Sequence, residues 1–116
     1  MLKFPKPRKA KKRQRHPASI VHAKDGTCFL CMLLDGDYSP KITEEHHIFH
    51  GNPNRRLSEN YGLKAYLCIA HHREGPKAVH KNRETDIILK KIAKTQFERY
   101  YPDKDFRAIF GKEDWI

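Results

Sequence analysis

Residues 44–50 read EEHHIFH and place three histidines, His46, His47 and His50, directly behind two acidic residues. A neutral imidazole can bind a metal ion or accept a proton near neutral pH, so this cluster suits metal-assisted acid–base chemistry. Successive side chains of a strand point to opposite sides. The adjacent pair His46 and His47 can therefore present one ring to a cation and the other to a water molecule.

The three cysteines of the chain lie in two pairs of potential metal ligands, each separated by two residues. One pair is Cys28 and Cys31, and the other is Cys68 and His71. Three thiolates and one imidazole form a closed tetrahedral site for structural Zn²⁺. His72 is an alternative fourth ligand, although the spacing favours His71. The other interpretation is buried free cysteines beside a surface histidine.

The segment from Cys28 to about Thr95 resembles the HNH endonuclease superfamily, the ββα-metal nucleases, in its zinc-knuckle form. More narrowly, it is similar to small HNH proteins of phage and prophage origin. The similarity lies in EEHHIF at a strand, a turn-rich loop, and LCIAHH leading into a helix. The resemblance implies a metal-dependent DNA endonuclease or nickase that hydrolyses phosphodiester bonds, acting in phage DNA processing or recombination.

The resemblance also implies roles for the histidines. His46 binds the catalytic divalent cation (Mg²⁺, Mn²⁺ or Zn²⁺), and His47 is the general base. His72 takes the place of the last histidine of the superfamily and binds the same cation. His80 is a further ligand if the loop at residues 75–76 brings it close to the cation held by His46 and His72. His50 has no equivalent in the motif, and a phosphate contact or solvent exposure suits it better than metal.

The central asparagine of the HNH motif is displaced. The spacing of the family points to Leu63, whereas Asn60, the catalytic candidate, lies three residues earlier. Asn52 and Asn54 are alternatives in the same loop. The displacement favours a second hypothesis, a catalytically inactive HNH scaffold that binds zinc and a nucleic acid or a host protein.

The net charge of +10 is concentrated near the N-terminus. Residues 1–24 hold nine basic side chains and no acid, and residues 1–18 include three prolines and few apolar residues. We predict a disordered basic arm over residues 1–18 and a folded domain over residues 19–116. Binding to DNA explains the arm, although a solubility tail or a targeting address would have the same composition. The predicted nucleic-acid contacts are Lys9, Lys11, Lys12, Arg13, Arg15, Arg55 and Arg56.

The length of 116 residues allows one small domain, and a composition that is 38% hydrophobic predicts a thin core that a metal would brace. The odd number of cysteines argues against a disulfide framework and favours a reducing compartment, the cytoplasm, or that of a host cell if the protein is phage-encoded. No apolar run approaches the roughly 20 residues of a membrane span, and no secretory signal is expected. A monomer is assumed.

The pattern of elements predicts an α+β fold. The turn dipeptides at residues 25–26 and 35–36 suggest hairpins. Residues 50–64 are predicted to form a long loop between two strands, the second of which ends at Leu67. Asn82 is expected to cap a long helix ended by Pro102, and a short helix with Gly111 at its C-terminus follows. The expected core positions of the two helices are Leu89, Ile92, Ala93, Phe97, Tyr100, Phe106, Ile109 and Phe110, with Trp115 packed onto them.

Overall fold

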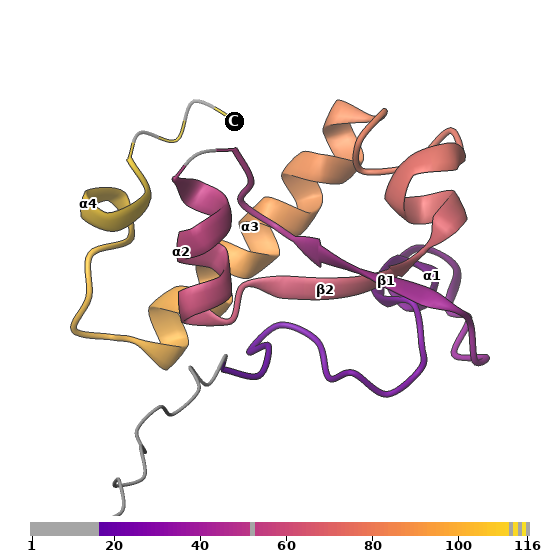
Figure 1. Ribbon diagram of the computed structural model, residues 1–116, viewed down its shortest axis with the longest axis horizontal. Helices are drawn as coiled ribbons and strands as arrows, with labels where there is room; N and C mark the ends of the chain where they lie inside the picture. Colours follow the sequence, from indigo (N-terminus) through magenta and orange to yellow (C-terminus); the bar gives the residue numbers. More distant parts are fainter. Residues whose placement is uncertain (1–16, 52, 112, 114, 116) are drawn as a thin grey trace, which may run out of the picture.

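The computed structural model describes residues 17–51, 53–111, 113 and 115, and its architecture is α+β. In Figure 1 a two-stranded sheet lies between α1 at one end and α2 and α4 at the other, and α3 crosses behind it. The five basic residues predicted to bind DNA from the arm lie outside the described residues. The elements in chain order are α1 (Phe29–Asp35), β1 (Thr43–His47), α2 (Asn54–Tyr61), β2 (Lys64–Cys68), one π-helical turn η2 (Ala70–Glu74), α3 (Arg83–Tyr100) and α4 (Phe106–Phe110).

Strands β1 and β2 pair antiparallel, with Thr43 opposite Cys68 and His47 opposite Lys64. Because side chains alternate along a strand, Glu44 and His46 share one face of β1, and the two residues at 45 and 47 share the other. The strand therefore divides its two glutamates and its two histidines between two environments.

The hydrophobic core joins the sheet to the C-terminal helices. Its fully buried members include Ile48, Phe49, Leu63, Leu67, Leu89 and Phe97, and Phe106 and Phe110 close it from the side of α4. The aromatic rings pack closely, as the 5.1 Å between the ring centroids of Phe49 and Phe110 shows. The core thus draws on residues from the α1 region to the C-terminal region.

The prediction for α3 is confirmed at its N-terminus, where the Asn82 side chain accepts a hydrogen bond from the Thr85 N–H. Leu89, Ala93 and Phe97 are buried as expected. Tyr100 is 64% exposed, so its prediction as a core residue was wrong. The last turn of α3 extends past the core, and Tyr101 packs against Phe97 in its place.

The short C-terminal helix is also confirmed. Asp105 caps α4 by accepting hydrogen bonds from the backbone N–H groups of Arg107 and Ala108. Gly111 follows with a positive φ of 88°. The ring of Trp115 lies 5.6 Å from that of Phe49, so the chain returns to the core after α4.

The structure corrects the predicted loop at residues 50–64, because α2 occupies most of it. Pro53 precedes the helix, and Gly62 ends it with a φ of +72°. A Cβ atom at Gly62 would lie 2.5 Å from the Ala18 carbonyl oxygen, so no larger residue fits there. Leu57 and Tyr61, four residues apart, turn to the core. That spacing and the glycine were the helical features of a segment otherwise rich in turn residues.

The predicted hairpins around residues 25–26 and 35–36 are also wrong, because α1 lies between them. The Cys28 sulfur accepts a hydrogen bond from the Cys31 N–H at the start of the helix. Gly36, at a φ of 64°, is the C-cap of that helix. The aspartate–glycine dipeptide therefore ends a helix here, a conformation that uses the same left-handed glycine as a turn.

The segment before α1 runs beside β2. The Ile20 N–H donates to the Gly62 carbonyl at 2.9 Å. His22 is 6% exposed, and its Nδ1 accepts a hydrogen bond from the Tyr66 N–H at 3.1 Å. His22 is thus a structural residue that satisfies a strand donor. Among the described helices, none has the length and apolar character that crossing a membrane requires.

Candidate functional site

Cys28, Cys31, Cys68 and His71 come together at the end of the sheet, and their four ligand atoms lie within 4.8 Å of one another. The Cys31 and Cys68 sulfurs are 3.8 Å apart, and His71 Nδ1 lies 3.4–3.7 Å from the three sulfurs. A zinc tetrahedron with Zn–S of about 2.3 Å and Zn–N of about 2.0–2.1 Å separates its ligands by about 3.8 Å (S···S) and about 3.5 Å (S···N). The cluster therefore has the dimensions of a site that could hold a metal such as zinc.

The chemistry of the cluster also fits a cation. Burial and the neighbouring Cys28 and Cys68 raise the pKa of the Cys31 thiol to about 12. Three thiolates this close would repel one another unless a positive ion lay among them. Cys28 and Cys31 come from the first turn of α1, Cys68 from the end of β2 and His71 from η2. A bound metal would therefore join three elements.

His71 and His72 are adjacent on η2 but belong to two clusters. The second cluster contains His46, His72 and His80, whose ligand atoms also lie within 4.8 Å of one another. Nε2 of His72 is 3.2 Å from Nε2 of His80. The centroid of the His46 ring is 5.2 Å from that of His72 and 5.1 Å from that of His80. The structure thus places the three histidines that were assigned to the catalytic metal side by side.

His46 offers an independent indication of a ligand. The residue is only 3% exposed, and its Nε2 is buried with no hydrogen-bond partner among the described residues. An unsatisfied buried polar atom is costly, and a cation would satisfy it. Burial, followed by the neighbouring imidazoles, lowers the pKa of His46 to about 3, so its ring is neutral and able to ligate.

A tight loop after η2 brings His80 close to His72. Gly75 lies so close to the preceding turn that a Cβ atom would be 2.6 Å from the Ala70 carbonyl oxygen. The Val79 N–H then donates to the His71 carbonyl at 2.8 Å. These contacts fold residues 75–80 back over η2 and bring the His80 ring beside His72.

Glu44 orients His72, a role that the sequence analysis did not assign. Its Oε1 lies 2.7 Å from His72 Nδ1, and Arg73 holds both carboxylate oxygens at 2.8–3.0 Å. Arg73, followed by His72, lowers the pKa of Glu44 to about 2. An ionised carboxylate only accepts, so His72 Nδ1 carries the proton and Nε2 keeps its lone pair for a ligand. Side chains alternate along β1, so Glu44 and His46 point to the same face, and this pattern could have identified Glu44 as a neighbour of the histidine cluster.

His47 turns to a different neighbour. Its Nε2 lies 2.7 Å from Glu59 Oε1 on α2, and the residue is 9% exposed. Lys64, opposite His47 in the sheet, reaches Glu59 at 3.3 Å and Glu45 at 3.4 Å. The two histidines of the pair therefore have different neighbours: His46 lies against the imidazoles of His72 and His80, and His47 lies against a carboxylate.

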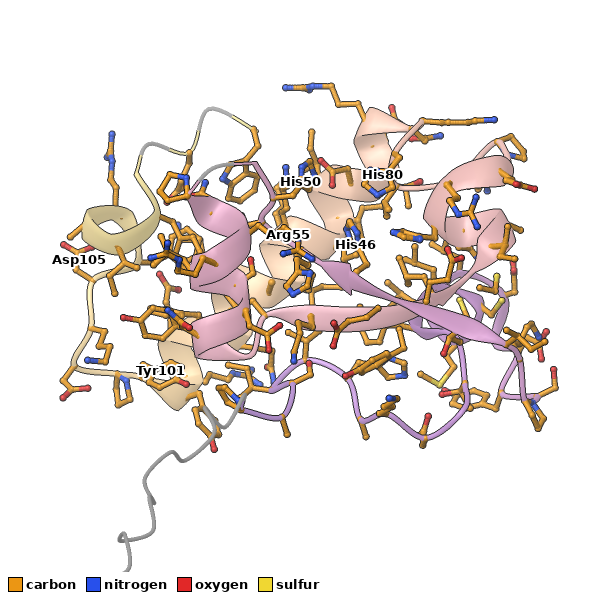
Figure 2. All side chains as sticks on the ribbon, viewed as in Figure 1. His46, His50, Arg55, His80, Tyr101 and Asp105 are labelled. Atoms are coloured by element: carbon orange, nitrogen blue, oxygen red, sulfur yellow. The ribbon has the colours of Figure 1, made fainter. Side chains whose placement is uncertain are left out.

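Two open hollows meet at His47. One, of about 220 Å³, is lined by the His46, His72 and His80 cluster together with Glu45, His47, His50 and Arg55. The other, of about 430 Å³, is lined by Glu45, His47, Arg55, Glu59 and Lys64. Figure 2 shows Arg55 of α2 beside His46, with His50 and His80 above.

Arg55 therefore lies where it can reach a phosphate bound in either hollow. Arg56 is exposed and lines neither of these two hollows. His50 lines the smaller one, and its Nε2 is 3.9 Å from Asp86 Oδ1, too far for a hydrogen bond. Of the two neighbouring arginines on α2, Arg55 is the one that lines the candidate site.

Asn60 lies on α2 with an exposed side chain and lines neither of the two hollows. Asn54 begins the same helix, and Asn52 lies outside the described residues. Ser58 of α2, which is fully buried, joins this helix to Phe49, just after β1. Its hydroxyl donates to the Phe49 carbonyl at 2.6 Å and accepts from the Phe49 N–H at 3.0 Å.

Ser58 and Glu59 were missed because the segment was predicted as loop. A helical assignment would have put them on successive positions facing β1.

Comparison of the chain with protein-family models, with curated proteins and with solved structures finds no match. The function is therefore inferred from the arrangement of the side chains and from the motif of the sequence.

Proposed function

We propose that this protein is a metal-dependent DNA endonuclease or nickase that hydrolyses phosphodiester bonds in the manner of the HNH nucleases. The observation that carries the proposal is the pairing of two functions on successive residues of β1. His46 joins a three-imidazole cluster with an unsatisfied nitrogen, and His47 is held by a carboxylate beside the same hollow. Such a division suits a cation ligand and a general base.

The three imidazoles would hold a divalent cation, which would stabilise charge on the phosphate and on the departing 3′ oxygen. A set of neutral nitrogen ligands favours transition ions such as Zn²⁺ or Ni²⁺ over Mg²⁺. The protein side chains perform the other steps. His47 accepts a proton from the attacking water as the water oxygen bonds to phosphorus and the bond to the 3′ oxygen breaks. Arg55 binds the phosphate oxygens.

The basic composition of the chain supports DNA as the substrate. The net charge of +10 attracts a polyanion, and the site itself contains an arginine and a lysine next to the histidines. In this proposal residues 1–16 increase affinity without regard to sequence, and the folded domain provides the chemistry. A phage-related role in DNA processing or recombination remains part of the proposal through the resemblance of its motif.

The test is nicking of supercoiled plasmid by the purified full chain with Zn²⁺, Ni²⁺, Mn²⁺ and Mg²⁺ in turn. His47→Ala should lower the rate roughly 10²–10⁴-fold, the usual contribution of a general base. It should retain DNA binding and the zinc of the cysteine cluster, because His47 contacts neither cysteine pair. His46→Ala should lose the catalytic cation, and a higher metal concentration should partly restore cleavage by mass action.

A variant prepared in parallel, Glu98→Gln on the exposed side of α3, controls for purification and for loss of one carboxylate. Equal cleavage by the native protein and by His47→Ala would show that the activity comes from contamination or another mechanism. In that case the alternative, a zinc-braced scaffold that binds nucleic acid or a protein without cleaving, would replace the nuclease.

A further inference from the structure

The carboxylate beside His47 belongs to a small, partly buried network. Glu59 uses one oxygen to meet His47 Nε2 at 2.7 Å and the other to meet Lys64 Nζ at 3.3 Å. Lys64 is 4% exposed. Burial alone would lower the pKa of Lys64, but Glu45 and Glu59 outweigh burial and raise it, so the ammonium stays charged beside Glu59. The lysine in turn stabilises the ionised form of that carboxyl group.

The hydrogen-bonding inventory fixes the proton on the ring. An ionised carboxylate is an acceptor only, so His47 Nε2 must be the donor in its contact with Glu59. In the neutral imidazole the other nitrogen, Nδ1, then carries the lone pair. Nδ1 is the atom that can accept a proton, and His47 borders the hollow that the metal-ligand cluster also lines.

Two other interpretations of the network fit less well. Glu45, His47 and Glu59 have ligand atoms within 4.8 Å of one another, which could suit a second cation. Lys64 Nζ, however, already lies within 3.4 Å of both carboxylates and supplies the positive charge there.

A purely structural tie between α2 and β1 is the other interpretation. The two hydrogen bonds of Ser58 to Phe49 already make that connection. Glu59 is not required for it, and a polar network beside a candidate base is better explained by its effect on the base.

We propose that Glu59 is a positioning residue that holds His47 as the Nε2–H tautomer, with Nδ1 available to take the proton, and that Lys64 keeps Glu59 ionised. The consequence for cleavage rests on the proposed nuclease function. The tautomer and the orientation of the ring do not depend on that function and can be measured without it.

The kinetic test compares Glu59→Gln with the native chain in plasmid nicking. A glutamine amide can donate to Nε2 and so favour the other tautomer, with its proton on Nδ1. We expect kcat to fall between about tenfold and the ~10⁴-fold seen on losing the carboxylate of a Ser-His-Asp triad. KM should change less than kcat, because Glu59 hydrogen-bonds the proposed base directly. Glu59→Asp should recover part of the loss, and Glu98→Gln should behave as the native protein.

The second readout is the imidazole ¹⁵N and ¹H spectrum of histidine-labelled protein, with His47 identified by its disappearance in His47→Ala. The native protein should show a His47 Nε2–H proton that is shifted downfield and exchanges slowly with water. Glu59→Gln should lose that signal while the thermal transition and the zinc content stay unchanged.

The outcomes separate the two proposals. A slowly exchanging Nε2–H in a protein that cuts no DNA would support the role of Glu59 and refute the nuclease. A native protein that cuts DNA as fast as its Glu59→Gln variant would refute the positioning role. If Glu59→Gln failed to fold, the native spectrum and Glu59→Asp would still decide, and an Nδ1–H tautomer in the native protein would overturn the inference.

Discussion

Removing the metal from the cysteine cluster should unfold the protein. The cluster connects α1 to the end of β2 and to η2, and both Cys28 and Cys31 belong to the core. A domain of roughly 100 folded residues has a free energy of unfolding of about 5–15 kcal/mol. Zinc binding in comparable small sites is worth about 10–16 kcal/mol. The metal-binding energy is therefore as large as the whole stability, and the chelated chain should not stay folded.

The assay is thermal and chemical denaturation followed by circular dichroism, with metal content measured by mass spectrometry. The purified chain should hold about one tightly bound Zn²⁺ in this cluster, its cooperative transition should vanish after chelation, and added Zn²⁺ should restore it. Cys68→Ser should behave as the chelated protein does. His80→Ala is the matched control, because it removes an imidazole of the other cluster and should leave the transition in place.

The reasoning would be refuted by a protein that loses its zinc and keeps the same transition temperature. That result would mean that the core alone, including Leu30 and Leu67, holds the three elements together. A chelated protein that remains cooperative but melts at a lower temperature would show that the metal contributes only part of the stability. The prediction of unfolding would then be wrong in magnitude.

Three further predictions concern the core, the pH dependence and the N-terminal segment. Ser58→Ala should lower the free energy of unfolding by about 1–3 kcal/mol in urea titrations, because the buried Phe49 N–H and carbonyl lose their partner; an exposed Ser39→Ala change should cost less. Burial holds the pKa of His22 below 6.5, so its contribution to stability is complete above about pH 6.5 and declines as the pH falls below it. The loss of stability between about pH 7 and 5 should be less steep in His22→Asn, and identical slopes would contradict this assignment. Removal of residues 1–16 should weaken DNA binding and reduce its salt dependence without changing the thermal transition. An unchanged dependence of the binding constant on salt would show that the folded domain binds the DNA.

The two halves of the cysteine cluster, the histidine pair and the long helix were predictable because their determinants are local. Cys28 and Cys31, like Cys68 and His71, are three residues apart, a spacing that one helical turn or a strand end brings together. Asn82 and the apolar repeat through Phe97 define α3 without help from the rest of the chain. In such stretches the types of the side chains and their spacing are enough to predict how those side chains are arranged.

Helix α2 and the partners of the histidines were decided only by the tertiary structure. Residues 54–61 carry few apolar side chains, and their helix is stabilised by burying Leu57 and Tyr61 against a core that other elements supply. Glu59 and His47 are 12 residues apart, and Glu44 and His72 are 28 apart. No local pattern marks such pairs, because a carboxylate shows its partner only when folding places it at hydrogen-bond distance. The sequence determined which side chains have the chemistry to bind a metal or accept a proton, and the packing of α2 and η2 against β1 decided which nitrogen of His47 and of His72 faces a carboxylate.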